Sequence, residues 1–140
     1  MTRPTRGSIL LLAAAAAIAA TVVVALRVVG SPADERERRA DRRRVDDLRA
    51  MALAVDRYWG QHQRLAASVG DLIAEGGSAL TVLDPTTAEP YEYRTLGGKA
   101  YEVCARFHRD SADTGTRPDD FWKHGQGRQC FRLEASPLPK

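Results

Sequence analysis

The chain has 140 residues, and an apolar run near its start leaves about 110 for everything else, which suits one small domain. This length excludes a multidomain enzyme or a large cofactor-binding machine. The net charge of +3 is unevenly placed: residues 1–30 hold three arginines and no acid, residues 31–50 hold seven arginines and six acids, and residues 51–140 hold eleven Lys/Arg and twelve acids. The domain itself is nearly neutral, so we expect no nucleic-acid partner.

An uncharged stretch of nineteen residues runs from Ser8 to Leu26. As a helix with a rise of ~1.5 Å per residue it would be about 28 Å long, close to the hydrocarbon thickness of a bilayer. Arg27 can reach the headgroups from the helix end. We therefore predict a short basic segment at residues 1–7 and a transmembrane helix over residues 8–29, with the lipid bilayer as its partner. A cleavable signal peptide is the alternative, because two arginines precede the run.

Two features disagree on which side of the membrane holds the domain. Seven arginines follow the predicted span closely and two precede it, which favours a cytoplasmic C-terminal domain. Cys104 and Cys130, the only cysteines, favour the opposite side, because closing a loop of this length by a disulfide contributes about 3 kcal/mol in an oxidising compartment. We follow the cysteines and expect a disulfide-closed extracytoplasmic domain. Two reduced, buried thiols are the alternative.

A second helix is expected after Gly30. Ser31 is a good N-cap residue and Pro32 suits the first helical position, while Gly60 supplies a stop after Trp59. Apolar positions recur at intervals of three and four residues, which predicts one buried stripe packed on a sheet: Val45, Leu48, Ala52, Val55 and Trp59.

The first half of this helix has no comparable stripe. We predict a charged, solvated helical stalk over residues 30–44 and a globular domain over residues 45–134. Arginines of the stalk are candidates to hold anionic lipid headgroups, with interleaved acids that dilute their field: Arg36, Arg39, Arg42, Arg43 and Arg44.

The rest of the chain predicts a small antiparallel sheet. A capping box at residues 68–71 indicates a short helix over residues 69–75. From Tyr91 the apolar period becomes two, and Gly97-Gly98 is a hairpin turn signal within residues 91–107. A last strand is expected over residues 129–133.

The fold class is therefore α+β: an N-terminal transmembrane helix, then a long amphipathic helix packed on a small antiparallel β-sheet. The tail, residues 135–140 with two prolines, is expected to be disordered or extended.

Local sequence carries a family resemblance. Residues 84–93 read Asp-Pro-Thr-Thr-Ala-Glu-Pro-Tyr-Glu-Tyr, and residues 58–73 combine an aromatic helix end, a polar linker and a short helix. With the order of elements, these segments resemble bacterial type IV pilins and type II secretion pseudopilins, above all the major pseudopilins. The resemblance covers about residues 8–107 and implies a pilin-like fold at the inner membrane.

The N-terminus departs from that family. Its members are cut after a glycine and carry a glutamate five residues further on, which is thought to neutralise a neighbouring subunit's new amino terminus in the apolar filament core. Here Gly7 is the matching glycine, and Leu12 occupies the glutamate position. We therefore expect a pilin-like domain on an uncleaved signal anchor rather than a filament subunit.

A late polar loop offers carboxylates for Ca²⁺, which major pseudopilins bind in a comparable loop. The spacing is not that of an EF-hand and two arginines offset half the charge, so a solvated loop is the expectation. The weak candidates are Asp110, Asp113, Asp119 and Asp120. Three histidines and two cysteines lack zinc-ligand spacing, and we expect no metal or other cofactor.

A second loop places aromatic side chains beside cations and glycines, as many interface residues are. Its candidate interaction residues are Phe121, Trp122, His124 and Arg128. The alternative is that Phe121 and Trp122 close the open end of a small core.

Known catalytic motifs are not found in the sequence, and a disulfide would consume both possible thiol nucleophiles, so we expect no enzyme. The predicted function is protein–protein interaction or scaffolding by a single-pass, membrane-anchored pilin-like domain in a bacterial envelope assembly. The alternatives are a pseudopilin-type filament subunit and an extracytoplasmic ligand or calcium sensor. The oligomeric state and the process are left open.

Overall fold

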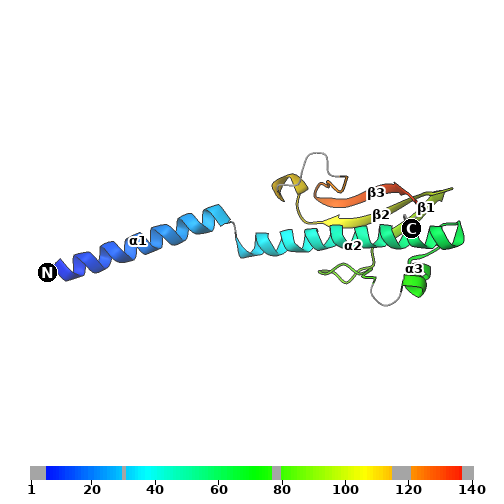
Figure 1. Ribbon diagram of the computed structural model, residues 1–140. Helices are drawn as coiled ribbons and strands as arrows, with labels where there is room; N and C mark the ends of the chain where they lie inside the picture. Colours follow the sequence, from blue (N-terminus) through cyan, green and yellow to red (C-terminus); the bar gives the residue numbers. More distant parts are fainter. Residues whose placement is uncertain (1–5, 30, 77–79, 115–120, 137–140) are drawn as a thin grey trace. The chain divides into compact units, whose positions relative to one another are not determined.

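The computed structural model describes residues 6–29, 31–76, 80–114 and 121–136. Their elements follow in chain order (Figure 1): α1 (Arg6–Val29), α2 (Pro32–His62), α3 (Val69–Gly76), β1 (Glu92–Gly97), β2 (Ala100–Phe107), the 3-10 helix η1 (Ser111–Thr114) and β3 (Gly127–Glu134). The chain divides into two units, Met1–Arg36 and Glu37–Lys140, and each is described by itself.

Helix α1 is the one described helix that is long and apolar enough to cross a membrane. It has 24 residues and begins two residues before the predicted start. Its large apolar side chains are exposed, Leu11 to 73%. Such a surface is costly in water, and a hydrocarbon environment removes the cost.

Helix α2 begins as its sequence predicts and ends later. Ser31 and Asp34 form a reciprocal capping box, with Ser31 Oγ accepting from the Asp34 amide at 3.1 Å and Asp34 Oδ2 accepting from the Ser31 amide at 3.2 Å. The predicted stop at Gly60 is wrong, because the helix continues to His62. Gln63 ends it with a left-handed φ of 53°, and its amide donates to the Trp59 carbonyl at 2.9 Å.

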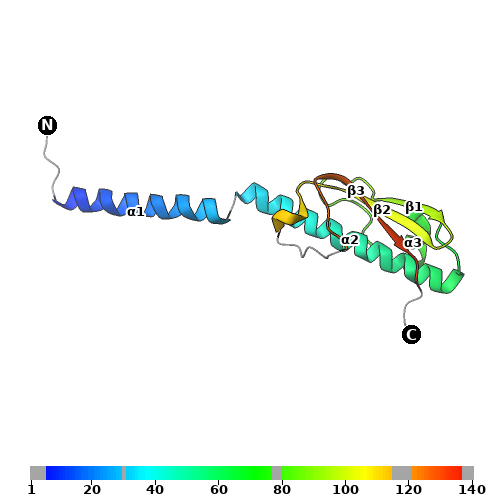
Figure 2. The ribbon, with the colours of Figure 1, turned by 90° about the horizontal axis from the view of Figure 1, so that it is seen from above.

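The sheet has three antiparallel strands in the order β1-β2-β3 (Figure 2). Gly97 and Gly98 have φ values of 102° and 58°, the left-handed conformation that glycine adopts easily in tight hairpin turns. The predicted hairpin and last strand are confirmed, and with the helices they give the predicted α+β class. A bulge leaves Leu96 without a partner between the pairs Thr95–Tyr101 and Gly97–Ala100.

The core lies between α2 and one face of the sheet. Leu48, Met51 and Val55 on the helix are fully buried, as are Tyr101 and Val103 on β2. The predicted stripe is present but broader, because Met51 and Tyr58 join it while Val45 and Trp59 are only partly buried. Burying each such large side chain contributes about 1.5–3 kcal/mol.

The opposite face of the sheet carries the disulfide. Cys104 and Cys130 are directly opposed on β2 and β3, and their Sγ atoms are 2.15 Å apart. The predicted pairing is therefore confirmed. It closes a segment of 26 residues and fastens the last strand to the hairpin.

Candidate functional site

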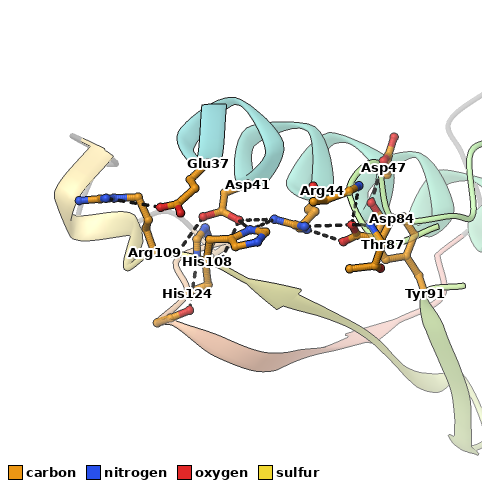
Figure 3. Close-up of polar contacts among 12 residues, drawn as sticks. Glu37, Asp41, Arg44, Asp47, Asp84, Thr87, Tyr91, His108, Arg109 and His124 are labelled. Atoms are coloured by element: carbon orange, nitrogen blue, oxygen red, sulfur yellow. Dashed lines mark hydrogen bonds and ion pairs between the residues drawn. The ribbon is translucent and has the colours of Figure 1, made fainter. Parts of the chain in front are cut away.

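One arginine of α2 is almost completely buried. Arg44 is 1% exposed and lies one turn before Leu48, so it continues the buried face of the helix toward the N-terminus. Its guanidinium makes two bonds to Asp84, from Nε to Oδ2 and from Nη2 to Oδ1 at 2.9 Å, and Nη1 donates to Asp41 Oδ1 at 2.6 Å. Figure 3 shows this side chain between the two carboxylates. A planar guanidinium suits such two-point binding of a carboxylate.

Asp84 comes from a loop that satisfies much of its own backbone. Leu83 and Pro90 form an isolated antiparallel bridge, and Asp84 Oδ1 accepts the amides of Thr86 and Thr87 at 2.8 and 3.0 Å. Burial would raise the pKa of Asp84, but the hydrogen bonds from Arg44 and from these amides outweigh burial and lower the pKa to about 2. Asp84 is thus a permanent anion at neutral pH.

Asp41 ties the end of β2 to the same helix. Its carboxylate accepts the amide of His108 at 3.0 Å and the amide of Arg109 at 2.9 Å. The ring Nδ1 of His108 lies 2.6 Å from Nη1 of Arg44. Because a guanidinium has only donors, Nδ1 is the acceptor in this contact.

Further polar contacts of α2 lie one helical turn before Asp41 and one turn after Arg44. Arg109 pairs with Glu37 at 3.6 Å, and the Tyr91 hydroxyl donates to Asp47 Oδ2 at 2.8 Å. Burial raises the pKa of Asp47, partly offset by that hydrogen bond, and burial with the nearby carboxylate raises the pKa of Tyr91. We call the set centred on Arg44 the Arg44 network: Glu37, Asp41, Arg44, Asp47, Asp84, Tyr91, His108 and Arg109.

An open groove of about 780 Å³ lies beside this network. One wall is formed by seven consecutive residues, 104–110, from the end of β2 onward. The other is formed by Thr87 and residues 89–92, and the rest of the lining comes from Glu37, Arg44, Asp84 and residues 126–128. We call it the β2 groove. Its volume is within the range of about 300–1,000 Å³ that ligand sites occupy.

The network is arranged to hold position rather than to transfer protons. Asp84 and Asp41 are both occupied by Arg44 and by backbone amides. Removing one partner of such a buried pair leaves an uncompensated charge, so the pairs hold α2, the loop at Asp84 and the end of β2 together tightly. The result is a groove whose walls are tied to α2 by the Arg44 network.

The predicted lipid-facing arginines divide into two groups. Arg39, Arg42 and Arg43 are exposed in the second unit, and Arg36 is exposed in the first. Arg44 is wrong as a headgroup contact, because it is buried and its guanidinium donates to two buried aspartates. The solvated stalk is also shorter than residues 30–44, since Asp41 is 2% exposed within the domain.

The four predicted interaction residues do not form one surface. Phe121 is 56% exposed, whereas Trp122 packs on Phe131 with ring centroids 4.8 Å apart, as the core-closing alternative expects. His124 is wrong as an exposed contact: it is 7% exposed and stacks on Phe107 at 3.7 Å. Arg128 is exposed on the other face of the sheet, where it makes a two-point ion pair with Glu92 at 2.8 and 2.7 Å.

The calcium candidates are only partly described. Asp110 Oδ1 accepts the Ala112 amide at 2.8 Å at the start of η1. The side chain of Asp113, and Asp119 and Asp120 altogether, lie outside the described residues. Among the described residues, potential metal-ligand atoms come close together in one group, Glu102, Cys104 and Cys130. The two cysteine sulfurs of this group are joined in the disulfide.

Several residues of the Arg44 network escaped the sequence reasoning. Residues 37, 41, 44 and 47 recur at helical spacing before Leu48 and so continue its side of the helix. All four are charged, and charged helix residues are ordinarily expected to face solvent. Asp84 stood out only as part of a family resemblance.

Comparison with protein-family models, curated proteins and solved structures finds no match for the chain.

Proposed function

We propose that this protein is a single-pass membrane protein that presents a small pilin-like α+β domain outside the cytoplasm, where the domain binds a partner protein within a bacterial envelope assembly. One observation carries the proposal: a domain closed by the Cys104–Cys130 disulfide follows, in the same chain, a helix with the length and composition of a membrane span.

The disulfide supports the compartment. Disulfides persist in oxidising compartments and are rare where thioredoxin and glutathione keep thiols reduced. Both cysteines of the chain are used in this one bond. The basic residues after α1 favour the cytoplasmic side, and we give the covalent bond more weight because it requires an oxidant.

The β2 groove supports binding as the activity. Its walls come from a strand and a loop that the Arg44 network holds against α2, and the carboxylates of Asp41 and Asp84 are hydrogen-bonded within that network. A rigid, partly charged groove lowers the entropy lost on association, because the protein side is ordered before the partner arrives.

Thiol labelling in intact bacterial cells tests the topology. A membrane-impermeant maleimide should label the full chain only after reduction, and labelling should not require opening the inner membrane. The matched control is the variant carrying both Cys104→Ser and Cys130→Ser, which should stay unlabelled throughout. Labelling without reduction, and only after the inner membrane is opened, would overturn the extracytoplasmic assignment.

A pseudopilin-type filament subunit is the second candidate. It is favoured by the order of elements, an apolar helix followed by a long helix packed on an antiparallel three-stranded sheet. Filament assembly requires cleavage after Gly7, and Leu12 stands where that family carries its glutamate. Intact mass spectrometry of the purified chain should show that the segment before Ser8 is retained. A mass reduced by the first seven residues would support the filament instead.

A further inference from the structure

The three-stranded sheet has a gap at one end of its central strand. Strand β1 pairs with β2 only as far as Glu92–Cys104, whereas β3 pairs with β2 as far as Gly127–Phe107. In the described ladders, residues 105–107 of β2 therefore have a strand neighbour on one side only. Alternate residues of a strand turn their N–H and C=O groups to opposite sides, so at least one of the three presents unpaired backbone groups to the free side.

The segment before β1 leaves this free edge open. Its described backbone bonds stay within the segment: Tyr91 donates to the Val82 carbonyl at 2.8 Å, and Asp84 donates to the Glu89 carbonyl at 2.8 Å. The β2 groove occupies the resulting space. Seven consecutive residues of both side-chain orientations line it, which identifies it as a groove along a strand edge rather than a pocket in one sheet face.

The groove also holds a cation without a described charge partner. Most of its charges are neutralised in pairs, Arg128 with Glu92, Arg109 with Glu37 and Arg44 with Asp84. Arg106 is exposed, has no such pair among the described residues, and stands directly opposite Arg128 in the β2–β3 register. Like charges at directly opposed positions are destabilising, and an anion beside them relieves the repulsion.

We propose that the β2 groove binds an extended peptide of a partner protein, which adds to the free edge of residues 105–107 as a short strand and places an acidic side chain against Arg106. Backbone bonds to the edge supply sequence-independent affinity, and Arg106 supplies the preference for an acid. Glu89 on the loop wall and Asp110 beyond the end of β2 also line the groove without a described ion pair, and they disfavour an acid on their sides, which leaves Arg106 as the position for the acidic side chain. This names the partner chemistry of the binding role proposed above and rests on that role.

Peptide display on the full chain tests the proposal. Phage carrying random eight-residue peptides are panned on the protein in nanodiscs, with empty nanodiscs as counter-selection. We expect the enriched peptides to share one acidic position flanked by β-branched residues. Failure to enrich any sequence, or enrichment without an acidic position, would overturn the proposal.

Two variants and a modified peptide locate the contact. Arg106→Glu should weaken binding of an enriched peptide at least tenfold by fluorescence anisotropy, and Arg106→Gln should weaken it less. The matched control is Arg132→Glu, an exposed arginine of β3 that does not line the groove, which should leave binding within twofold. Equal losses in Arg106→Glu and Arg132→Glu would mean unspecific charge attraction and would refute the site.

Strand addition makes a separate demand on the peptide backbone. N-methylation at alternate amides should abolish binding at one parity and leave the other parity unaffected, because only alternate amides face β2. Equal tolerance at every amide would overturn strand addition. These results do not depend on topology, so the peptide site can fail while thiol labelling supports the extracytoplasmic domain, and the reverse.

Discussion

Replacing Arg44 by methionine should be among the most destabilising single changes in the domain. The substitution keeps an unbranched apolar stem in place of the arginine methylenes but removes the bonds to Asp84 and Asp41. Both carboxylates then remain buried without their cation, and breaking a buried pair in this way costs about 3–5 kcal/mol. For a domain of this size that loss lowers Tm by roughly 12 °C or more.

The change in unfolding stability at acidic pH gives a second test of the ion pair between Arg44 and Asp84. Asp84 has a folded-state pKa of about 2 against an ordinary value of 3.8, and this depression contributes about 2 kcal/mol of stability. A depressed carboxylate pKa gives stability that is present above pH 4 and is lost as the pH falls toward 2. In Arg44→Met this loss should be smaller, because burial then favours the protonated acid and only the amides of Thr86 and Thr87 still stabilise the carboxylate.

Unfolding of the full chain in nanodiscs can be followed by tryptophan fluorescence, since the two tryptophans of the chain, Trp59 and Trp122, both pack against the core. Arg43→Met is the matched control, because Arg43 is the exposed neighbour on the same helix, and it should change stability by less than about 0.5 kcal/mol. Arg44→Lys should fall between the two. Equal stability of Arg44→Met and Arg43→Met would refute the buried network as a structural tie.

Three further outcomes are expected. Cys104→Ser and Cys130→Ser should each cost about 3–4 kcal/mol in urea unfolding, from closure of a 26-residue segment, with the double variant no worse; additive losses would contradict a shared bond. Tyr91→Phe should lower the free energy of unfolding by about 1–2 kcal/mol, because Asp47 loses its half-buried hydrogen-bond donor. Tyr93→Phe is the comparison, since the Tyr93 hydroxyl donates to the neutral carbonyl of Ala66. Millimolar Ca²⁺ should leave Tm unchanged within 1 °C, and a clear rise would revive the calcium-sensor alternative.

The elements that local sequence controls were predictable. The N-cap at Ser31, the capping box at Ser68, the glycine turn of the hairpin and the apolar period of α2 all act within a few residues, and the structure contains each of them. The disulfide was also predictable, because two strand-like segments carried the only two cysteines.

The Arg44 network was not predictable, because its partners lie far apart in sequence. Arg44 and Asp84 are separated by 40 residues, and Asp41 and the amide of His108 by 67. A charged residue in a helix is expected to face solvent unless its partner is known, so the sequence predicts a buried face made of apolar residues alone. The gap beside β2 was hidden for a similar reason, since it depends on where the ladder with β1 stops.

The position of the Arg44 network gives the domain a mechanical property. Helix α2 is the segment through which any tension from the N-terminal helix enters the domain, and Asp41 grips the end of β2 only a few residues after that point. A pull between α1 and a partner held at this end of β2 would pass from helix to strand through the hydrogen bonds that the amides of His108 and Arg109 donate to Asp41. The apolar core, the hairpin turn and the disulfide would lie off that load path, so the domain could transmit force while most of its fold remained unstressed.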